Sequence, residues 1–589
     1  MLHRFFAAAA AALVFVAPAL AQPLVMPGER ALASKAAIPA QLRLGAAPTQ
    51  VVRATLPPIT DDEVEAVRAR NSAAKGAVRE QQRRVTIGLA RPLTGTFLGA
   101  AEMRWTRVPG GHAAQVALTS PQAGSLRLAI DLAGVPADVE MVFFGSSDPG
   151  RLEGPVKAGD IADRTRPWWS PLIEGETQTV EFFVPGRHDP ARLALGVAGA
   201  SHVFTTPSTR FTKRLQDVGV AGSCNVDVPC SSLNANAAFR NAVESVAQMV
   251  FNDAGFTVLC SGTLLADADA ARQTPWFYSA NHCFENDAAP YKSAAQMQVV
   301  ANTLTTIWGF EASACNSRTP RSGWAQLGGG ATHIYNNPQN DVLFLRLNAT
   351  PPASAFYSGW DANPVASGNA LLSLHHPQGD LKKVSQGSVV RFSSPGVAGA
   401  NASFIEVLWG QGTTEAGSSG GGLWSSSGGQ YAFRGGLWGG SALCSNLSGT
   451  DYFSRFDQAY PQLAAYLAAS APPAVDYTDL WWNPAESGWG LNLIQHPSRT
   501  IFGVWYTYEL DGTRTWYVML SGSWVNANTY TGALYATSGP AFNGPFNPDQ
   551  VDARQVGNAT LTFSDANHGT FAFSVDGVSG VKSITRQSF

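Results

Sequence analysis

Residues 414–422 read Thr-Glu-Ala-Gly-Ser-Ser-Gly-Gly-Gly and set two serines inside a cluster of glycines. Such a cluster, taken alone, is also typical of a flexible linker. The glycines allow the backbone to turn tightly enough for the N–H groups of Gly417 and Ser419 to point at one place. Two N–H groups that converge in this way can stabilise the negative oxygen of an acyl-transfer intermediate. The stretch therefore makes Ser419 a candidate nucleophile, with Gly417 and Ser419 as its oxyanion hole.

Two apolar stretches upstream carry residues that could activate such a serine. Residues 276–283, Trp-Phe-Tyr-Ser-Ala-Asn-His-Cys, predict a strand that ends at His282, and residues 340–345, Asn-Asp-Val-Leu-Phe-Leu, put Asp341 before a second strand. Each has a plainer explanation alone, because a histidine is often structural and an aspartate before a strand is often a turn residue. The order His282, Asp341, Ser419 is nevertheless that of one known catalytic triad. Together the three stretches predict a serine nucleophile with its base and its orienting acid.

The chemistry of acyl transfer explains these three residue types. A serine hydroxyl is a weak nucleophile until a base within hydrogen-bond reach takes its proton. A neutral His282 can be that base near pH 7 and can return the proton to the leaving amine. A buried Asp341 would hold the imidazole in the required tautomer and stabilise its cation.

The same stretches resemble those of a known family of peptidases. The bacterial lysyl endopeptidases, which have the chymotrypsin fold, carry similar stretches. Their histidine motif is similar to residues 278–283, their aspartate motif to 340–345 and their nucleophile motif to 414–420. The resemblance covers about 219–470. It implies an all-β, double β-barrel serine endopeptidase that cleaves protein or peptide substrates after lysine. Four shorter stretches support the resemblance: 222–225, 359–361, 374–377 and 437–440.

All six cysteines fall between residues 224 and 444. An even number of cysteines in an exported protein favours disulfides over thiolate metal sites. Six cysteines allow about 15 pairings, and nothing in the residues themselves selects one. The family resemblance implies the following bridges: Cys224–Cys444, Cys230–Cys315 and Cys260–Cys283.

Substrate specificity depends on an acid that could meet a cationic side chain. Thr413 occupies the place of the acid that trypsin uses, six residues before the nucleophile. The resemblance instead implies Asp451 as the acid, although an aspartate in such a stretch is also typical of a solvated turn. Trp438 replaces a histidine of the family, and Trp438 and Gly439 should lie on the strand that pairs with an extended substrate. If Asp451 is not the acid, Glu415 beside the nucleophile is the next candidate.

No cofactor or metal is expected. The adjacent residues His375 and His376 suggest a metal site at first. Neighbouring residues on a strand point to opposite faces, so the two imidazoles cannot bind one ion together. No suitably spaced carboxylate or cysteine lies near them in the sequence.

The N-terminus predicts export. A basic start, an apolar run and the ending Ala-Leu-Ala at residues 19–21 form a signal-peptide pattern, and the run is too short to span a membrane.

The sequence also predicts two helices and the bounds of four parts. The stretch Thr60-Asp61-Asp62-Glu63 opens one helix with a capping box. Residues 460–467 predict a final helix of the peptidase, with a proline near its first turn. The predicted parts are 1–21, a signal peptide; 22–218, a propeptide with a β-sandwich over about 91–206; 219–470, the peptidase; and 474–589, a small Trp- and Tyr-rich β-domain.

The propeptide should assist folding and block the cleft. Activation by a newly cut N-terminus, as in trypsin, is not expected, because Ser418 stands where trypsin has the aspartate that receives it. The resemblance puts the mature start at Gly219, shortly after a possible self-cleavage site at Lys213-Arg214.

Composition leaves three function classes open. The formal net charge of −3 argues against a general nucleic-acid binder, and no later segment is apolar enough to span a membrane. The first class is a secreted endopeptidase specific for basic residues, the second a serine peptidase of broader preference, and the third a binding protein on an inactive peptidase scaffold. The aromatic residues of the C-terminal domain either stack on sugars or pack a small core, and packing is the favoured interpretation.

Overall fold

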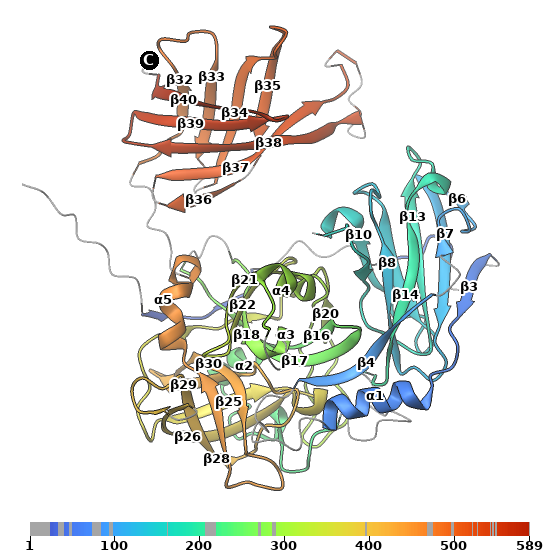
Figure 1. Cartoon of the computed structure of the whole chain (residues 1–589), viewed down its shortest axis with the longest axis vertical. Coiled ribbons are helices and arrows are strands. Elements are labelled where there is room, and N and C mark those ends of the chain that lie inside the picture. Colours follow the sequence, from blue (N-terminus) through green and yellow to red (C-terminus); the bar gives the residue numbers. More distant parts are fainter. Residues whose placement is uncertain are drawn as a thin grey trace, which may run out of the picture.

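The structure is a computed structural model, and it describes residues 24–587 with internal gaps. The gaps are 33–39, 46–49, 73–83, 94–97, 162, 207–219, 269–272, 286–289, 395–396, 468–474, 496–499, 521, 527, 542, 545–546 and 548–549. The described part is mainly β-strand and forms an N-terminal sandwich, a double barrel and a C-terminal β-domain (Figure 1). The predicted all-β fold class is thus confirmed. The predicted signal peptide, residues 1–21, lies outside the described residues.

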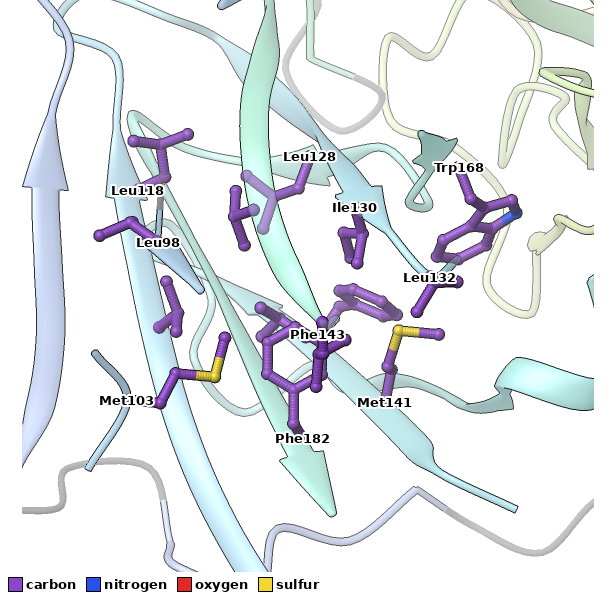
Figure 2. Close-up of a cluster of buried hydrophobic side chains, with 14 of the residues drawn as sticks. Leu98, Met103, Leu118, Leu128, Ile130, Leu132, Met141, Phe143, Trp168 and Phe182 are labelled. Carbon is purple, nitrogen blue, oxygen red and sulfur yellow. The ribbon is translucent and has the colours of Figure 1, made fainter. Parts of the chain in front are cut away.

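The N-terminal domain is a sandwich of two sheets. One sheet has the order β10-β9-β13-β7-β3 with β6 beside β7, and the facing strands run β11-β8-β14-β4. Their inner faces bury a cluster that includes Leu128, Phe143, Trp168 and Phe182, which Figure 2 shows between the sheets. The strands are β3 (Val51–Thr55), β4 (Val85–Pro92), β5 (Leu98–Gly99), β6 (Thr106–Val108), β7 (Gly111–Thr119), β8 (Ser125–Asp131), β9 (Glu140–Gly145), β10 (Glu153–Lys157), β11 (Trp168–Trp169), β12 (Ile173–Glu174), β13 (Thr177–Pro185) and β14 (Gly196–Val203).

The sandwich takes in β3 and most of β4, which precede the boundary expected near residue 91. β3 pairs in parallel with β7, and β4 pairs with β14. Between them lies helix α1 (Asp61–Ser72), which begins with the predicted capping box. The Thr60 N–H donates to Glu63 (2.8 Å), and the Glu63 N–H donates to the Thr60 hydroxyl (3.2 Å). Each residue thus satisfies a backbone donor of the other, and the helix start is confirmed.

Strand β4 joins the N-terminal domain to the double barrel. Its second edge pairs with β17 (Phe256–Leu265), so one sheet runs continuously from the sandwich into the first barrel. Figure 1 shows β4 and α1 between the two bodies. The segment before the sandwich also contacts the peptidase, because β1 (Val25–Met26) pairs with β24 (Trp360–Asp361) and β2 (Glu29–Arg30) with β23 (Phe356–Tyr357).

The first barrel is built around β17, which pairs with β16 and β18. The β16–β17 hairpin turns at Ala254 and Gly255, both with positive φ, as a tight hairpin requires. Its remaining elements are α2 (Ala237–Glu244), β16 (Val246–Asp253), β18 (Trp276–Ala280), α3 (Asn281–Phe284), α4 (Ala294–Ala301), β19 (Thr305–Trp308), β20 (Ala325–Leu327), β21 (Ala331–Asn337) and β22 (Val342–Leu347).

The second barrel has the strand order β30-β29-β25-β26-β28-β31, and it closes on itself because the two end strands of this order, β30 and β31, are also paired. A barrel without free edges gives a rigid frame for the loops at its end. Its strands are β25 (Ala370–His375), β26 (Lys383–Ser394), β28 (Phe404–Gln411), β29 (Gly422–Ser427), β30 (Gln430–Gly440) and β31 (Thr450–Ser454), with short β15 (Val226–Asp227) and β27 (Val397–Ala398) beside β26.

The final helix of the peptidase, α5, runs over Phe456–Leu467 and therefore begins earlier than predicted. Pro461 consequently lies inside the helix and not near its first turn, as the sequence suggested. Phe456 and Tyr460 are both buried against Trp360, so packing decides where this helix begins. Local helix signals are a weaker determinant than such burial.

The C-terminal domain is a nine-stranded sheet whose far ends meet through β35 and β37. Trp481 is fully buried within its aromatic core. No helix in the described ranges has both the length and the apolarity needed to cross a membrane. The strands are β32 (Asp479–Trp482), β33 (Gly490–Gln495), β34 (Ile501–Tyr508), β35 (Arg514–Met519), β36 (Gly522–Asn526), β37 (Thr529–Ser538), β38 (Asp552–Phe563), β39 (His568–Val575) and β40 (Val578–Arg586).

Candidate active site

His282 lies in α3, a single helical turn that directly follows β18. The turn is held in two ways. The neighbouring Cys283 is bridged to Cys260 of β17, and the Asn281 N–H donates to the carbonyl of Asp341 (3.2 Å). His282 is only 5 % exposed. The imidazole is thus fixed at the end of a buried strand, as the sequence predicts.

Asp341 stands at the entrance to β22 in a left-handed backbone conformation, with φ of 55°. Its carboxylate accepts two hydrogen bonds from one residue: the His282 N–H (2.9 Å) and His282 Nδ1 (2.8 Å). Burial raises the pKa of the Asp341 carboxyl, and the interactions with His282 oppose that rise. The strained φ is tolerated because both the carbonyl and the carboxylate of Asp341 are tied to the His282 turn.

Ser419 completes a chain of hydrogen bonds between the two barrels. Its Oγ lies 2.8 Å from His282 Nε2. A carboxylate can only accept, so the bond to Asp341 puts the imidazole proton on Nδ1 and leaves Nε2 to accept from the serine hydroxyl. The structure therefore brings together the three residues predicted from their order in the sequence, in an arrangement that could activate the serine oxygen as a nucleophile.

The backbone around Ser419 is set by glycine. Gly417 has φ of 89°, and a Cβ there would lie 3.0 Å from the His376 carbonyl oxygen, so a side chain would be strained twice. Among the described residues, none accepts a hydrogen bond from the Gly417 N–H. The Ser419 carbonyl accepts from the Ser261 N–H of β17 (2.8 Å), which fixes Ser419 against the first barrel. This geometry suits Gly417 as an oxyanion donor.

Ser418, the residue before Ser419, is fully buried and faces a histidine. Its hydroxyl lies 2.8 Å from His375 Nδ1, and His375 Nε2 lies 3.2 Å from the Ser385 hydroxyl. Burial lowers the pKa of His375 to about 3, so this imidazole is neutral near pH 7. An uncharged hydrogen-bonded chain of Ser418, His375 and Ser385 thus occupies the place where trypsin forms its activating ion pair. The neighbouring His376 bonds elsewhere, through Nδ1 to the Asp380 carbonyl (3.0 Å).

Asp451 is fully buried in β31, in the second barrel. Its Oδ2 accepts from Trp409 Nε1 (2.6 Å) and from the Thr414 hydroxyl (2.7 Å). Its Oδ1 has no hydrogen-bond partner among the described residues, and a Cβ on Gly440 would lie 2.2 Å from that oxygen. Burial raises the pKa of Asp451 to about 6, against the effect of the bonds from Trp409 and Thr414 and of the nearby Ala442 backbone N–H. A buried carboxylate with one unused oxygen is a strong candidate for binding a cation.

Trp438 and Gly439 lie on β30, which runs past the nucleophile loop. The Gly420 N–H donates to the Leu437 carbonyl (2.8 Å), so the strand is tied to that loop one residue before Trp438. The Trp438 ring stacks on Phe404, with centroids 4.8 Å apart, and meets the edge of Tyr452. This strand borders the candidate site, and its aromatic side chain is packed between two others.

Three disulfides are present, and they are the pairs that the resemblance implies: Cys224–Cys444, Cys230–Cys315 and Cys260–Cys283. None of the cysteines is free among the described residues. Disulfides of this kind fit an extracellular, oxidising compartment.

Two partners of Asp451 were not predicted from the sequence. Thr414 is the first residue of the nucleophile stretch, so its position was a usable signal. Trp409 comes from β28 and carried no signal, because only the barrel brings it to Asp451. Glu415, the alternative acid, turns away from this place and binds Gly222 and Asn225 instead.

Comparison with known proteins places the chain in a family. Residues 218–454 match the family described as lysyl endopeptidase, C-terminal domain, and residues 55–204 match the lysyl endopeptidase N-terminal domain. A lysyl endopeptidase of Pseudomonas aeruginosa is 36% identical over 379 residues, which make up 62% of this chain and 78% of that protein. The chain belongs to the lysyl endopeptidase family. It is accordingly a serine endopeptidase, and peptides are its substrates.

Two solved structures are similar to part of this lysyl endopeptidase family member. One is the thermostable serine protease AL20 from an extremophilic microorganism, with 13% identity, 39% of this chain and 99% of that chain covered, and a TM-score of 0.28. The other is Rv3671c from M. tuberculosis H37Rv in an inactive mutant form, with 16% identity, 42% and 95% covered, and a TM-score of 0.26.

Proposed function

We propose that this serine endopeptidase cleaves on the carboxyl side of lysine, and more weakly of arginine, through a Ser-His-Asp acyl-enzyme mechanism. One observation carries the specificity: Asp451 is fully buried and keeps Oδ1 unpartnered among the described residues. A desolvated ammonium group needs such an opposite charge. Arginine binds best when both carboxylate oxygens accept its planar fork, and here Oδ2 is already engaged. A single open oxygen therefore favours the compact lysine ammonium.

The proposed mechanism follows from the hydrogen bonds of the triad. His282 Nε2 takes the proton of Ser419 Oγ as that oxygen attacks the scissile carbonyl. The carbonyl oxygen becomes negative where the N–H groups of Gly417 and Ser419 point. His282, held and stabilised by Asp341, then gives the proton to the leaving amine, and an acyl-enzyme forms on Ser419. Water attacks the ester by the same steps and releases the peptide that ends in lysine.

A labelling and substrate experiment tests this proposal against the broader peptidase and the inactive binding protein. The secreted protein should react covalently with a fluorophosphonate at Ser419, and an inactive scaffold would not. It should also hydrolyse p-nitroanilides of lysine and arginine peptides far faster than that of a matched leucine peptide. Labelling without this preference would support the serine peptidase of broader specificity.

We propose further that residues 22–218 are a propeptide, which follows a signal peptide at 1–21 and leads to a secreted enzyme. Two contacts of the N-terminal domain support this role. β4 covers an edge of β17, and the Arg84 guanidinium donates to Asp253 (2.6 Å) and to the carbonyl of Cys283 (3.1 Å), beside His282. A domain that completes a sheet beside the catalytic histidine is suited to template that barrel and to cover the cleft. The proposed mature start, Gly219, lies outside the described residues.

A further inference from the structure

The segment that follows the N-terminal domain lies against the nucleophile stretch. The Ala221 N–H donates to Asp380 Oδ2 (3.0 Å), and the Gly222 N–H donates to Glu415 Oε2 (2.9 Å). The side-chain amide of Asn225 donates to the same Glu415 oxygen (2.9 Å). Two donors from one short turn thus converge on one oxygen atom, four residues before Ser419.

The turn is held from its other side by a disulfide. Cys224 is bridged to Cys444. A Cβ on Gly222 would lie 2.5 Å from Cys444 Sγ and 2.9 Å from Glu415 Oε1. Only a glycine therefore fits between the disulfide and the carboxylate. The close approach indicates that this contact is built into the fold and is not a surface pairing.

Glu415 is in turn coupled to the oxyanion loop. Its backbone N–H donates to the Ser418 hydroxyl (3.2 Å), and its carbonyl accepts from the Ser418 N–H (3.0 Å). Gly417 and Ser419, the proposed oxyanion donors, flank Ser418. Any shift of the Glu415 backbone would therefore move both N–H groups.

We propose that Glu415 is a positioning residue: by accepting hydrogen bonds from Gly222 and Asn225, it fixes the loop that presents the Gly417 and Ser419 N–H groups to the substrate. The inference rests on the proposed role of Ser419. In trypsin, a newly formed terminal amine fixes this loop. Here Glu415 fixes it by accepting hydrogen bonds from an internal turn. The loop is consequently set before the chain is cut, and activation needs only the departure of the N-terminal domain from the cleft.

The test compares Glu415→Ala with Glu415→Gln in the protein expressed as the full chain and purified after maturation. Because both bonds go to one oxygen, the single carbonyl oxygen of glutamine can replace it. Glu415→Ala should lower kcat by about 10- to 100-fold with little change in KM. The same variant should bind a peptide aldehyde ending in lysinal more weakly by the same factor, because the aldehyde forms a tetrahedral adduct that uses the oxyanion hole. Binding of n-butylamine, which resembles the lysine side chain and has no carbonyl group, should not change, and Glu415→Gln should stay close to the wild type.

Two results would overturn the inference: unchanged kcat and aldehyde affinity in Glu415→Ala, or a loss in Glu415→Gln as large as in Glu415→Ala. If Glu415→Ala does not fold, Asn225→Leu decides, since it removes one donor and keeps the side-chain size. Asn225→Leu should lower both kcat and the affinity for the peptide aldehyde. If neither quantity changes, the proposal is contradicted. The variant Ser419→Ala distinguishes a failure of the proposed function from a failure of this inference. Activity that survives Ser419→Ala defeats the proposed function, whereas full activity in Glu415→Ala beside an inactive Ser419→Ala defeats only this inference.

Discussion

At the scale of single residues, the proposed site consists of three hydrogen-bonded side chains and one buried acid. Adjacent serines allow a matched comparison, because Ser418 and Ser419 differ in what they face. Ser419→Ala should reduce kcat by on the order of 10⁶, since it removes the nucleophile next to His282. Ser418→Ala should be far milder, because the Ser418 hydroxyl bonds His375 and not the triad. The measurement is kcat for a lysine peptide substrate after removal of contaminating peptidases. Similar losses in the two variants would contradict the assignment.

The pH dependence of specificity is a second prediction at this scale. Burial raises the pKa of Asp451 to about 6, so the carboxylate becomes neutral as the pH falls through that value. The ratio of kcat/KM for a lysine substrate to that for a leucine substrate should therefore fall about tenfold between about pH 8 and about pH 5. The ratio cancels any pH effect on the chemical steps, which the two substrates share. A ratio that stays constant over this range would show that Asp451 does not meet the lysine.

The residues of the site could be predicted from the sequence to different degrees. His282, Asp341 and Ser419 were predictable because their order and flanking strands are specific in combination. Asp451 followed only from the family resemblance, since nothing local distinguishes it from a turn aspartate. Trp409 could not be predicted, because it reaches Asp451 through the pairing of β28 with β31.

At the scale of elements, β4 and β8 hold the N-terminal domain on the peptidase. Arg127 of β8 is fully buried, and its guanidinium donates to Asn252 Oδ1 (2.8 Å), the Thr303 carbonyl (2.8 Å) and the Thr305 hydroxyl (3.1 Å) of the first barrel. Burial lowers the pKa of Arg127 to about 9, yet the group stays charged near pH 7. The interface thus places one cation among neutral acceptors.

Replacement of this arginine should loosen the interface. In the uncleaved Ser419→Ala chain, Arg127→Met should lower the free energy of unfolding by about 1–3 kcal/mol, because buried acceptors lose their donor. Urea unfolding followed by tryptophan fluorescence measures the change. Arg107→Met is the matched control, since Arg107 is exposed on β6 of the same domain. Identical midpoints for the two variants would contradict the role of Arg127.

The elements themselves were predictable where local signals and burial agree. The α1 capping box and the β16–β17 hairpin follow from their own residues. The start of α5 does not, because Phe456 and Tyr460 extend the helix by packing on Trp360. The pairing of β4 with β17 joins residues more than 160 positions apart, and no local pattern in either strand indicates it.

At the scale of the whole molecule, the C-terminal domain has a sheet and a buried core of its own. In the described residues its strands pair only with one another, and its buried cluster lies entirely between Tyr477 and Ile584. Removal of the chain after about residue 472 should therefore leave kcat/KM for small peptide substrates nearly unchanged. If the folded, truncated enzyme lost most of this activity, the domain would be part of the active unit.

The central claim is that this endopeptidase recognises a basic residue of the substrate through Asp451 and cleaves the peptide bond after it with Ser419 as the nucleophile. Mass spectrometry of the peptides released from a denatured protein tests it directly. We predict new C-termini at lysine, with arginine second, for the wild type and none for Ser419→Ala. Asp451→Asn should keep its fold but lose several kcal/mol of transition-state stabilisation for the basic residues, while cleavage after uncharged residues falls much less. An unchanged preference for lysine and arginine in Asp451→Asn, or new C-termini from Ser419→Ala, would contradict the account.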